Sequence, residues 1–410
     1  MFPQAARAPA VRTYNVPMIY LDNNATTAID DHVRAAMLPY LAERYGNPSS
    51  VHRFGQEARQ AVERARFQVA GLLGCDPKEV LFTSGGTEAD NAALHGVLAE
   101  AAKAAGNRRI LTSAVEHSAV REPLAWLARN GWQVTEIDVD SSGLLDLNQL
   151  EEELKRGGVA LVTVMWANNE TGVVLNVAAV GELAHRHGAV FHCDGVQAAG
   201  KIPVDLRTVP IDLLSLSAHK FHGPKGVGAL YLRRGVRWSP FVRGGPQERE
   251  RRGGTENVTG IVGMGTAAEL AAAEFTPAGS AAAPAAPSTE TRIAALRDHL
   301  EHGLLQRIPE CFVNGDPAHR VPNTTNIGFA GLEAEAILLL LSEQDLCASA
   351  GAACASGSLE PSHVLRAMKL PERIAHGAVR FSLSRYTTEE EIAQALEILP
   401  GIIARLRTLL

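Results

Sequence analysis

The chain has 410 residues, of which 46% are hydrophobic and 20% are charged. This is the composition of a globular protein with a large core and room for two domains. The net charge of −6 and the pI near 6.2 give no electrostatic reason to expect binding to nucleic acid or to an anionic membrane. The five cysteines are an odd number and form no C-x-x-C pair, so we expect free thiols in a reducing compartment.

The sequence contains no apolar run long enough to span a membrane. Its opening, MFPQAARAPAVRTYNV, also lacks the apolar core of a signal peptide. This opening contains arginine and no acidic residue, so a short transit-like segment is the alternative to a frayed terminus. We expect a cytoplasmic protein.

Short β-rich runs alternate with helical stretches through the first two thirds of the chain. Continuous apolar strands separated by helices are typical of a mostly parallel sheet that is covered on both faces. The short link GPKG predicts an antiparallel pair at the end of the series. We expect this α/β domain to span 26–262. Its strands are predicted at 80–84, 109–113, 159–167, 189–194, 211–220 and 227–234.

The composition and the pattern of predicted elements change after about residue 262. The segment 275–291 is rich in Pro, Ala and Ser and predicts a surface linker. A helix at 292–306, a strand near NTTNIGF and the helix EAEAILLLLSEQ follow. Thr388 and Glu391 have the spacing of a capping box for the last helix. We expect a smaller α+β domain made of 1–25 and 263–410.

The stretch TSGGTEAD, residues 83–90, predicts the end of a strand, a two-glycine turn and the start of a helix. Thr87 and Asp90 fit a capping box. Exposed amides at a helix N-terminus, beside glycines that permit close approach, make an anion site, and a plain tight turn is the alternative. The pattern is neither a P-loop nor a dinucleotide-binding fingerprint.

Two further strand ends carry charged residues. Asp194 directly follows an apolar strand, where it is either a helix N-cap or the counter-ion of a cationic ring nitrogen. Lys220 follows the next strand, 26 residues on, and is either a solvated loop lysine or a nucleophilic amine. A phosphate-binding turn, an aspartate and a lysine in this order together indicate pyridoxal 5′-phosphate (PLP).

Related motifs extend from about residue 19 to residue 400. In this combination the chain resembles the cysteine desulfurases, PLP enzymes of aminotransferase class V with fold type I, and it looks closest to their nitrogen-fixation (NifS) branch. The resemblance implies a seven-stranded type of sheet. The motifs are YLDNNATT, GNPSS with His52 and Gly55, TSGGTEADN, VEH, MWANNETG, HCDGVQ, SAHKFHGPKG, RRGGTEN, VPNTTN, ASAGAACASGSLEPSHVLRAM and VRFSLSRYTTEEE.

The resemblance implies roles for the residues around the cofactor ring. Lys220 holds PLP as a Schiff base, Asp194 pairs with the pyridinium nitrogen, and Gln197 bonds the ring hydroxyl. His117 stacks on the ring face and relays protons. Taken without the family, His117 would be read as a core histidine.

The resemblance also implies how the phosphate is held. Gly86, Thr87, Ser217 and His219 surround it within one chain. Thr255 reaches the phosphate of the neighbouring subunit, so a homodimer is implied.

At the substrate end, the resemblance implies that Asn169 contacts both cofactor and substrate and that Arg380 grips the substrate carboxylate through its planar fork. Cys354 lies among small residues that allow a thiolate to travel, whereas a small buried hydrophobe is the alternative for a lone cysteine. The family role of Cys354 is attack on the substrate sulfur, within a mobile catalytic loop at 347–358.

The reaction implied is removal of sulfur from L-cysteine, which yields L-alanine and a persulfide on Cys354. An iron–sulfur scaffold protein is the expected acceptor, in general cluster assembly or in nitrogen fixation. Another class V enzyme and a non-catalytic α/β binding module are the alternatives. The histidine pairs at 185/187 and 219/222 match no zinc motif, so we expect no metal.

Overall fold

The structure is a computed structural model, and it describes residues 18–103, 106, 108–275, 288–350 and 360–409. Most of the expected linker at 275–291 lies outside these ranges, as does the part of the expected catalytic loop that contains Cys354.

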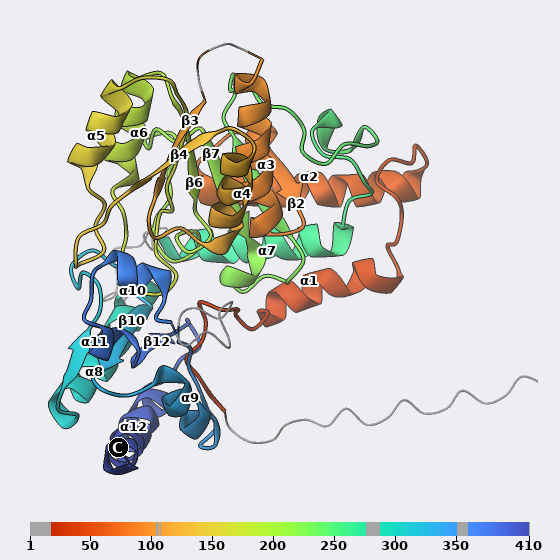
Figure 1. Cartoon of the computed structure of the whole chain (residues 1–410). Helices are drawn as coiled ribbons and strands as arrows, with labels where there is room; N and C mark the ends of the chain where they lie inside the picture. Colours follow the sequence, from red (N-terminus) through yellow and green to blue (C-terminus); the bar gives the residue numbers. More distant parts are fainter. Residues whose placement is uncertain (1–17, 104–105, 107, 276–287, 351–359, 410) are drawn as a thin grey trace, which may run out of the picture.

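A seven-stranded sheet forms the centre of the larger part (Figure 1). Its strand order is β2-β8-β7-β6-β5-β3-β4, and only β8 among these strands runs antiparallel to its neighbours. The expected mostly parallel sheet and its antiparallel β7–β8 pair are therefore confirmed. The strands are β2 Val80–Thr83, β3 Arg109–Ser113, β4 Gln133–Ile137, β5 Val159–Thr163, β6 Val190–Asp194, β7 Leu213–Ser217 and β8 Gly228–Leu232.

Helices cover both faces of this sheet, because its strands are apolar on both sides. Leu213 of β7 belongs to the core under α3 and α4, whereas Leu214 belongs to the core on the opposite face. This alternation is the two-residue period of a strand. The helices of the larger part are α1 Asp31–Ala42, α2 Arg53–Leu73, α3 Gly86–Ala101, α4 Ser118–Arg129, α5 Leu147–Lys155, α6 Val177–Arg186 and α7 Val258–Phe275.

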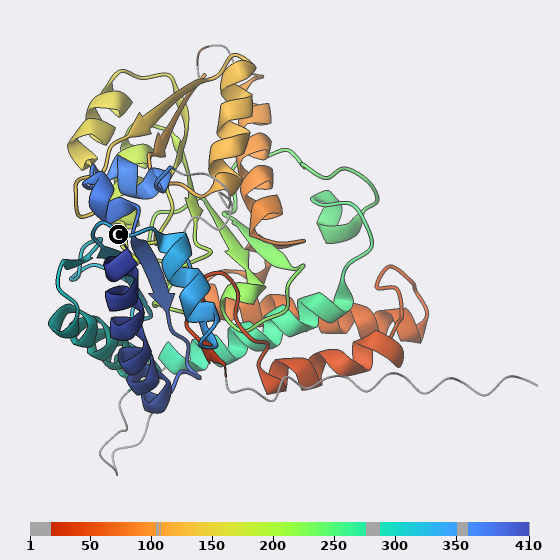
Figure 2. The same cartoon turned by 60° about the horizontal axis from the view of Figure 1, so that its bottom comes forward.

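The smaller part has its own hydrophobic core. Its antiparallel sheet has the order β12-β10-β9, and β1 of the N-terminal segment pairs in parallel with β11. Helices α8 and α12 pack side by side against this core (Figure 2). The elements are β1 Ile19–Tyr20, α8 Thr289–Arg307, β9 Cys311–Val313, β10 Thr324–Phe329, α9 Ala334–Ser342, β11 Leu346–Cys347, α10 His363–Ala367, α11 Glu372–Ala375, β12 Ala378–Ser382 and α12 Glu389–Leu409.

The packing of helix α7 indicates where the boundary between the two parts lies. The expected boundary at residue 262 falls inside this helix, and Met264, Ala267 and Ala271 beyond it are buried in the core of the larger part. We propose that the boundary lies after α7. Among the helices in the described ranges, none is both long enough and apolar enough to cross a membrane.

Two capping predictions had different outcomes. The backbone N–H of Thr388 donates to Glu391, and that of Glu391 donates to the Thr388 hydroxyl, which confirms the capping box of α12. The capping box at Thr87 is wrong, because α3 already begins at Gly86 and Gly85 is its N-cap. Gly85 has a φ of 154°, which a side chain would disfavour, so the double glycine sets the helix start.

Candidate active site

A cavity of about 440 Å³ opens at the carboxyl ends of the parallel strands, a volume within the usual range of ligand sites. Strand ends gather here because Asp194 closes β6 and Ser217 closes β7 on the same edge of the sheet. The cavity brings together ten of the residues singled out from the sequence. They are Gly86, Thr87, His117, Asn169, Asp194, Gln197, Ser217, His219, Lys220 and Arg380.

One end of the cavity suits an anion. The N-terminus of α3 contributes Gly86 and Thr87, and Ser217 and His219 face them from the end of β7. A Cβ added at Gly86 would lie 2.9 Å from Cγ2 of Val196 and 3.4 Å from Cβ of Ser217, so a side chain would fill the cradle. Free amides and the helix dipole favour negative charge at this end.

Asp194 is a buried acid next to this anion end. Its Oδ1 accepts a hydrogen bond from the backbone N–H of Val196 at 2.9 Å, which is a turn contact and not a helix cap. Burial raises the pKa of Asp194, whereas the charges of His117 and Lys220 oppose the shift. A carboxylate in this position gains stability when a cation is placed beside it.

Two further buried acids, Asp90 and Glu116, share this electrostatic environment. Burial, together with the charge of Asp194, raises the pKa of Asp90 well above its ordinary value. Burial raises the pKa of Glu116 to about 8. Sequence reasoning gave Asp90 only a capping role, which is wrong, and it missed Glu116, because a carboxyl group inside the motifs TEAD and VEH gives no signal that it is buried.

His117 caps α4 and lines the cavity. Its Nδ1 accepts from the backbone N–H of Ala119 at 3.1 Å, which leaves Nε2 to carry the proton of the neutral ring. Burial lowers the pKa of His117, and the charge of Lys220 adds to the shift while Asp194 opposes it. A neutral ring of this kind can stack on a cofactor and relay a proton.

Lys220 lies in the short 3-10 turn Ala218–Lys220 that follows β7. Its Nζ donates to the backbone carbonyl oxygens of Asn24 at 2.6 Å and Ala25 at 2.9 Å. The N-terminal segment therefore holds the lysine at the cavity. The neighbouring His219 has a pKa lowered to about 4 by burial and by the charges of Lys220, Lys225 and Lys201, so it is neutral at pH 7.

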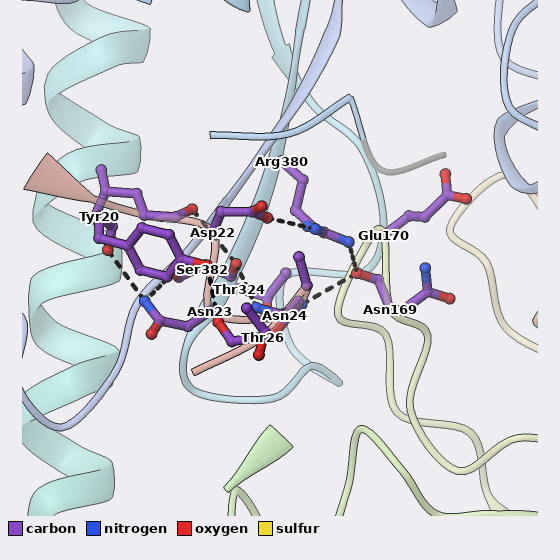
Figure 3. Close-up of polar contacts among 12 residues, drawn as sticks. Tyr20, Asp22, Asn23, Asn24, Thr26, Asn169, Glu170, Thr324, Arg380 and Ser382 are labelled. Atoms are coloured by element: carbon purple, nitrogen blue, oxygen red, sulfur yellow. Dashed lines mark hydrogen bonds and ion pairs between the residues drawn. The ribbon is translucent and has the colours of Figure 1, made fainter. Parts of the chain in front are cut away.

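Arg380 of β12 is buried and reaches the cavity from the smaller part (Figure 3). Its Nη1 donates to the carbonyl oxygen of Asn169 at 2.9 Å, and its Nη2 pairs with Asp22 at 2.7 Å. Nε has no hydrogen-bond partner among the described residues. The guanidinium is thus oriented by two protein acceptors and retains donors for a carboxylate.

Asn24 joins the two parts of the chain at the site. Its Nδ2 donates to the carbonyl oxygen of Asn169 and to the Thr324 hydroxyl, and its backbone N–H donates to the Ser382 hydroxyl (Figure 3). The motif YLDNNATT contained this residue and Asp22, but spacing along the chain does not predict partners more than 100 residues away. Other cavity-lining residues that sequence reasoning missed are Arg121, Glu170 and His363.

Thr255 lies outside the cavity in the single chain. It lines a separate hollow with Ser84, Gly226 and Glu248, beside the N-terminus of α3. Three successive residues, 248–250, have left-handed backbone angles in the loop that leads to it. The role of Thr255 at a partner subunit's phosphate stays a prediction. Cys354 lies outside the described residues.

The residues of the cavity fit PLP. The α3 amides, Ser217 and Thr87 are donors for a phosphate, and the cradle at Gly86 leaves room for it. Asp194 is a buried acceptor for a protonated ring nitrogen, and Lys220 supplies an amine for the cofactor aldehyde. No three His, Cys, Asp or Glu side chains within the described ranges are grouped so that they could hold a metal ion.

Comparison with known proteins decides the family. The aminotransferase class-V family profile matches residues 19–395. The chain belongs to the class-V aminotransferase family. It is 54% identical over 393 residues to a cysteine desulfurase of Nostoc sp., covering 96% of this chain and 94% of that protein. It is 50% identical over 391 residues to the cysteine desulfurase NifS of Azotobacter vinelandii, covering 95% and 93%.

A solved structure of a NifS-like protein has the same fold. It matches with a TM-score of 0.86 and 38% identity, covering 95% of this chain and 100% of that chain. Members of this class-V family depend on PLP, which agrees with the donors and acceptors of the cavity. The expected PLP-dependent transferase fold is confirmed.

Proposed function

We propose that this chain is a cysteine desulfurase, which removes sulfur from L-cysteine and releases L-alanine. The main support for the proposal is that Lys220, Asp194 and Arg380 line the same cavity. They supply an amine, a buried acid and a cation suited to a carboxylate. Relatives of about 50% identity that carry this name support it. These three groups are what an amino-acid substrate and PLP require.

Bound PLP supplies an electron sink for the negative charge that develops on the substrate Cα. Asp194 would favour this by offering a buried carboxylate to the protonated ring nitrogen. Arg380 binds the substrate carboxylate, and its contacts with Asp22 and Asn169 orient the guanidinium before the substrate arrives. Lys220 takes the Cα proton, and neutral His117 relays protons at the ring face. Gly86, Thr87, Ser217 and His219 would hold the phosphate, and Gln197 would bond the ring hydroxyl.

Cys354 is the sulfur nucleophile of the proposal. Its thiolate attacks the substrate sulfur, the bond from that sulfur to Cβ breaks, and the electron pair stays with the carbon. Cβ takes a proton, alanine leaves, and Cys354 carries the persulfide. An iron–sulfur scaffold protein then accepts the sulfur. The enzyme is a homodimer in which Thr255 serves the phosphate of the partner's site.

The test compares the wild type with Cys354→Ala, and Cys347→Ala is the matched control. Cys347, the expected first residue of the catalytic loop, lies instead in β11, where it pairs with Tyr20, and it has no role in the proposed chemistry. Alanine and sulfide release from L-cysteine are measured with a reducing thiol present. We expect Cys354→Ala to lose at least about a hundredfold in rate while staying yellow, and Cys347→Ala to keep its rate.

Two results would contradict the proposal. A Cys354→Ala enzyme that keeps its rate would remove the persulfide step, even though the cofactor assignment would stand. A wild type that binds PLP but releases no alanine from L-cysteine would exclude the desulfurase reaction and leave another class-V activity.

A further inference from the structure

Lys201 is a half-buried lysine next to the cavity that the reaction above does not use. It lies in the turn after β6, and its Nζ donates to Oδ1 of Asn24 at 2.7 Å and to Oε1 of Gln197. Burial lowers the pKa of Lys201 well below its usual range, and the charges of Lys220 and Arg380 add to the shift. Removing the charged amine of a lysine from water costs free energy, so a lysine at this position indicates a specific role for its amine.

The neighbours of Gln197 explain the position of Lys201. On one side of the Gln197 amide, Nε2 lies 3.0 Å from the backbone carbonyl oxygen of Asn24, which can only accept a hydrogen bond. On the other side, Oε1 faces Nζ of Lys201, which donates. Both neighbours therefore require the same orientation of the amide, with its N–H groups on the Asn24 side.

The same carbonyl oxygen of Asn24 also accepts from Nζ of Lys220 at 2.6 Å. Lys201, Gln197, Asn24 and Lys220 are thus joined in one chain of hydrogen bonds. The two ends of this chain are lysines, and Gln197 lines the cavity between them. A change at Lys201 is therefore transmitted through Gln197 to the place where the cofactor lies.

We propose that Lys201 is a positioning residue, which locks the Gln197 amide so that it offers an N–H, and not an oxygen, to the ring oxygen of the cofactor. The inference deepens the proposed function, because it rests on Gln197 facing bound PLP. Without Lys201, Oε1 of Gln197 becomes a buried acceptor with no donor, since the residue is only 6% exposed. Only the contact with the Asn24 carbonyl oxygen then fixes the amide, so both amide orientations become populated and the cofactor loses a fixed N–H donor.

The experiment measures PLP affinity and the absorbance spectrum of bound PLP in four proteins. They are the wild type, Lys201→Met, Gln197→Leu and the double variant. We expect each single variant to weaken PLP binding roughly tenfold, as the loss of one hydrogen bond does. We expect the double variant to be no more than about twofold weaker than Gln197→Leu alone. The pH midpoint of the absorbance change should shift in the same direction in both single variants.

Additive losses in the double variant would overturn the proposal, as would unchanged PLP affinity in Lys201→Met. Lys155→Met is the control, because Lys155 is an exposed lysine of α5 paired with Glu151. Melting of the cofactor-free proteins shows whether each variant folds. If Lys201→Met does not fold, Lys201→Gln, which retains an N–H donor, replaces it and should bind PLP within about threefold of the wild type. A tenfold loss there would count against the proposal.

These readouts require PLP but no L-cysteine. A failure of the desulfurase assay with a wild type that binds PLP would therefore overturn the proposed reaction and leave the role of Lys201 standing. Additive effects of the two substitutions on PLP binding in an active desulfurase would overturn the role of Lys201 and leave the proposed reaction standing.

Discussion

The ion pair between Arg66 of α2 and Glu248 offers a direct test of which contacts stabilise the loop that precedes Thr255. Both side chains are nearly inaccessible, at 3% and 4% exposed. Nη1 and Nη2 of Arg66 each donate to one Glu248 oxygen at 2.8 Å, and the backbone N–H of Phe82 donates to the same carboxylate at 3.0 Å. Glu248→Gln leaves the buried Arg66 charge with only the half-exposed Glu63, 3.2 Å from Nε, as a counter-ion.

Breaking one partner of a buried ion pair costs up to about 3–5 kcal/mol when no other counter-ion remains, and Glu63 reduces this loss toward the lower figure. An unfolding entropy of about 2.1 cal/mol/K per residue turns this loss, over the whole chain, into a fall in Tm of roughly 4–6 °C. The control is Glu57→Gln, which removes the same kind of contact from the exposed Arg53–Glu57 pair of α2. The expected loss there is at most about 0.5 kcal/mol.

Differential scanning calorimetry measures both variants. Equal, small shifts in Tm for Glu248→Gln and Glu57→Gln would refute the reasoning, because burial would then not decide the strength of the pair. A large fall confined to Glu248→Gln would tie the left-handed segment 248–250 to the stability of the larger part.

The remaining predictions concern the cavity. Burial raises the pKa of Glu116 in the folded state to about 8, from the ordinary 4.5 of the unfolded chain. The protonated Glu116 therefore contributes its full stability to the folded state below pH 4.5, and this contribution is lost as the pH rises to about 8. We therefore expect the wild type to lose stability relative to Glu116→Gln between pH 5 and pH 8 in urea titrations, and a constant difference would contradict the burial argument. Gly86→Ala, whose methyl group enters the anion cradle, should weaken PLP binding about tenfold by equilibrium dialysis, whereas Gly401→Ala, with open space around it, should leave it unchanged. Equal affinities would show that the cradle does not hold the phosphate.

Some of the site could be predicted from the sequence, because strands end where apolar runs end. Asp194 and Lys220 were placed at strand ends on this basis, and parallel strands bring such ends to one edge of the sheet. The arginine at 380 would have been read as a surface residue without the family resemblance. Its burial follows from β12, which lies next to β10 inside the smaller part.

Other contacts could not be predicted, because they join segments that are distant along the chain. The pair Asp22–Arg380 spans 358 residues, and periodicity carries no information on such pairs. Lys201 lies in a turn to which no motif was assigned, and its amine contacts Asn24 of the N-terminal segment, 177 residues earlier. The start of α3 was misplaced for a local reason, since two consecutive glycines allow the N-cap to precede the first polar side chain.

The insertion of the N-terminal segment between the two parts has a consequence for how the protein is made. The side chain of Asn23 donates to the carbonyl oxygen of Ser382, 359 residues later. At about 5–20 residues per second, the ribosome completes this partner roughly 20–70 s after Asn23 itself. The segment that holds Lys220 must wait that long for its final contacts. Capture of the cofactor therefore belongs to the end of biosynthesis, and a chain halted before β12 carries the lysine without a finished pocket around it.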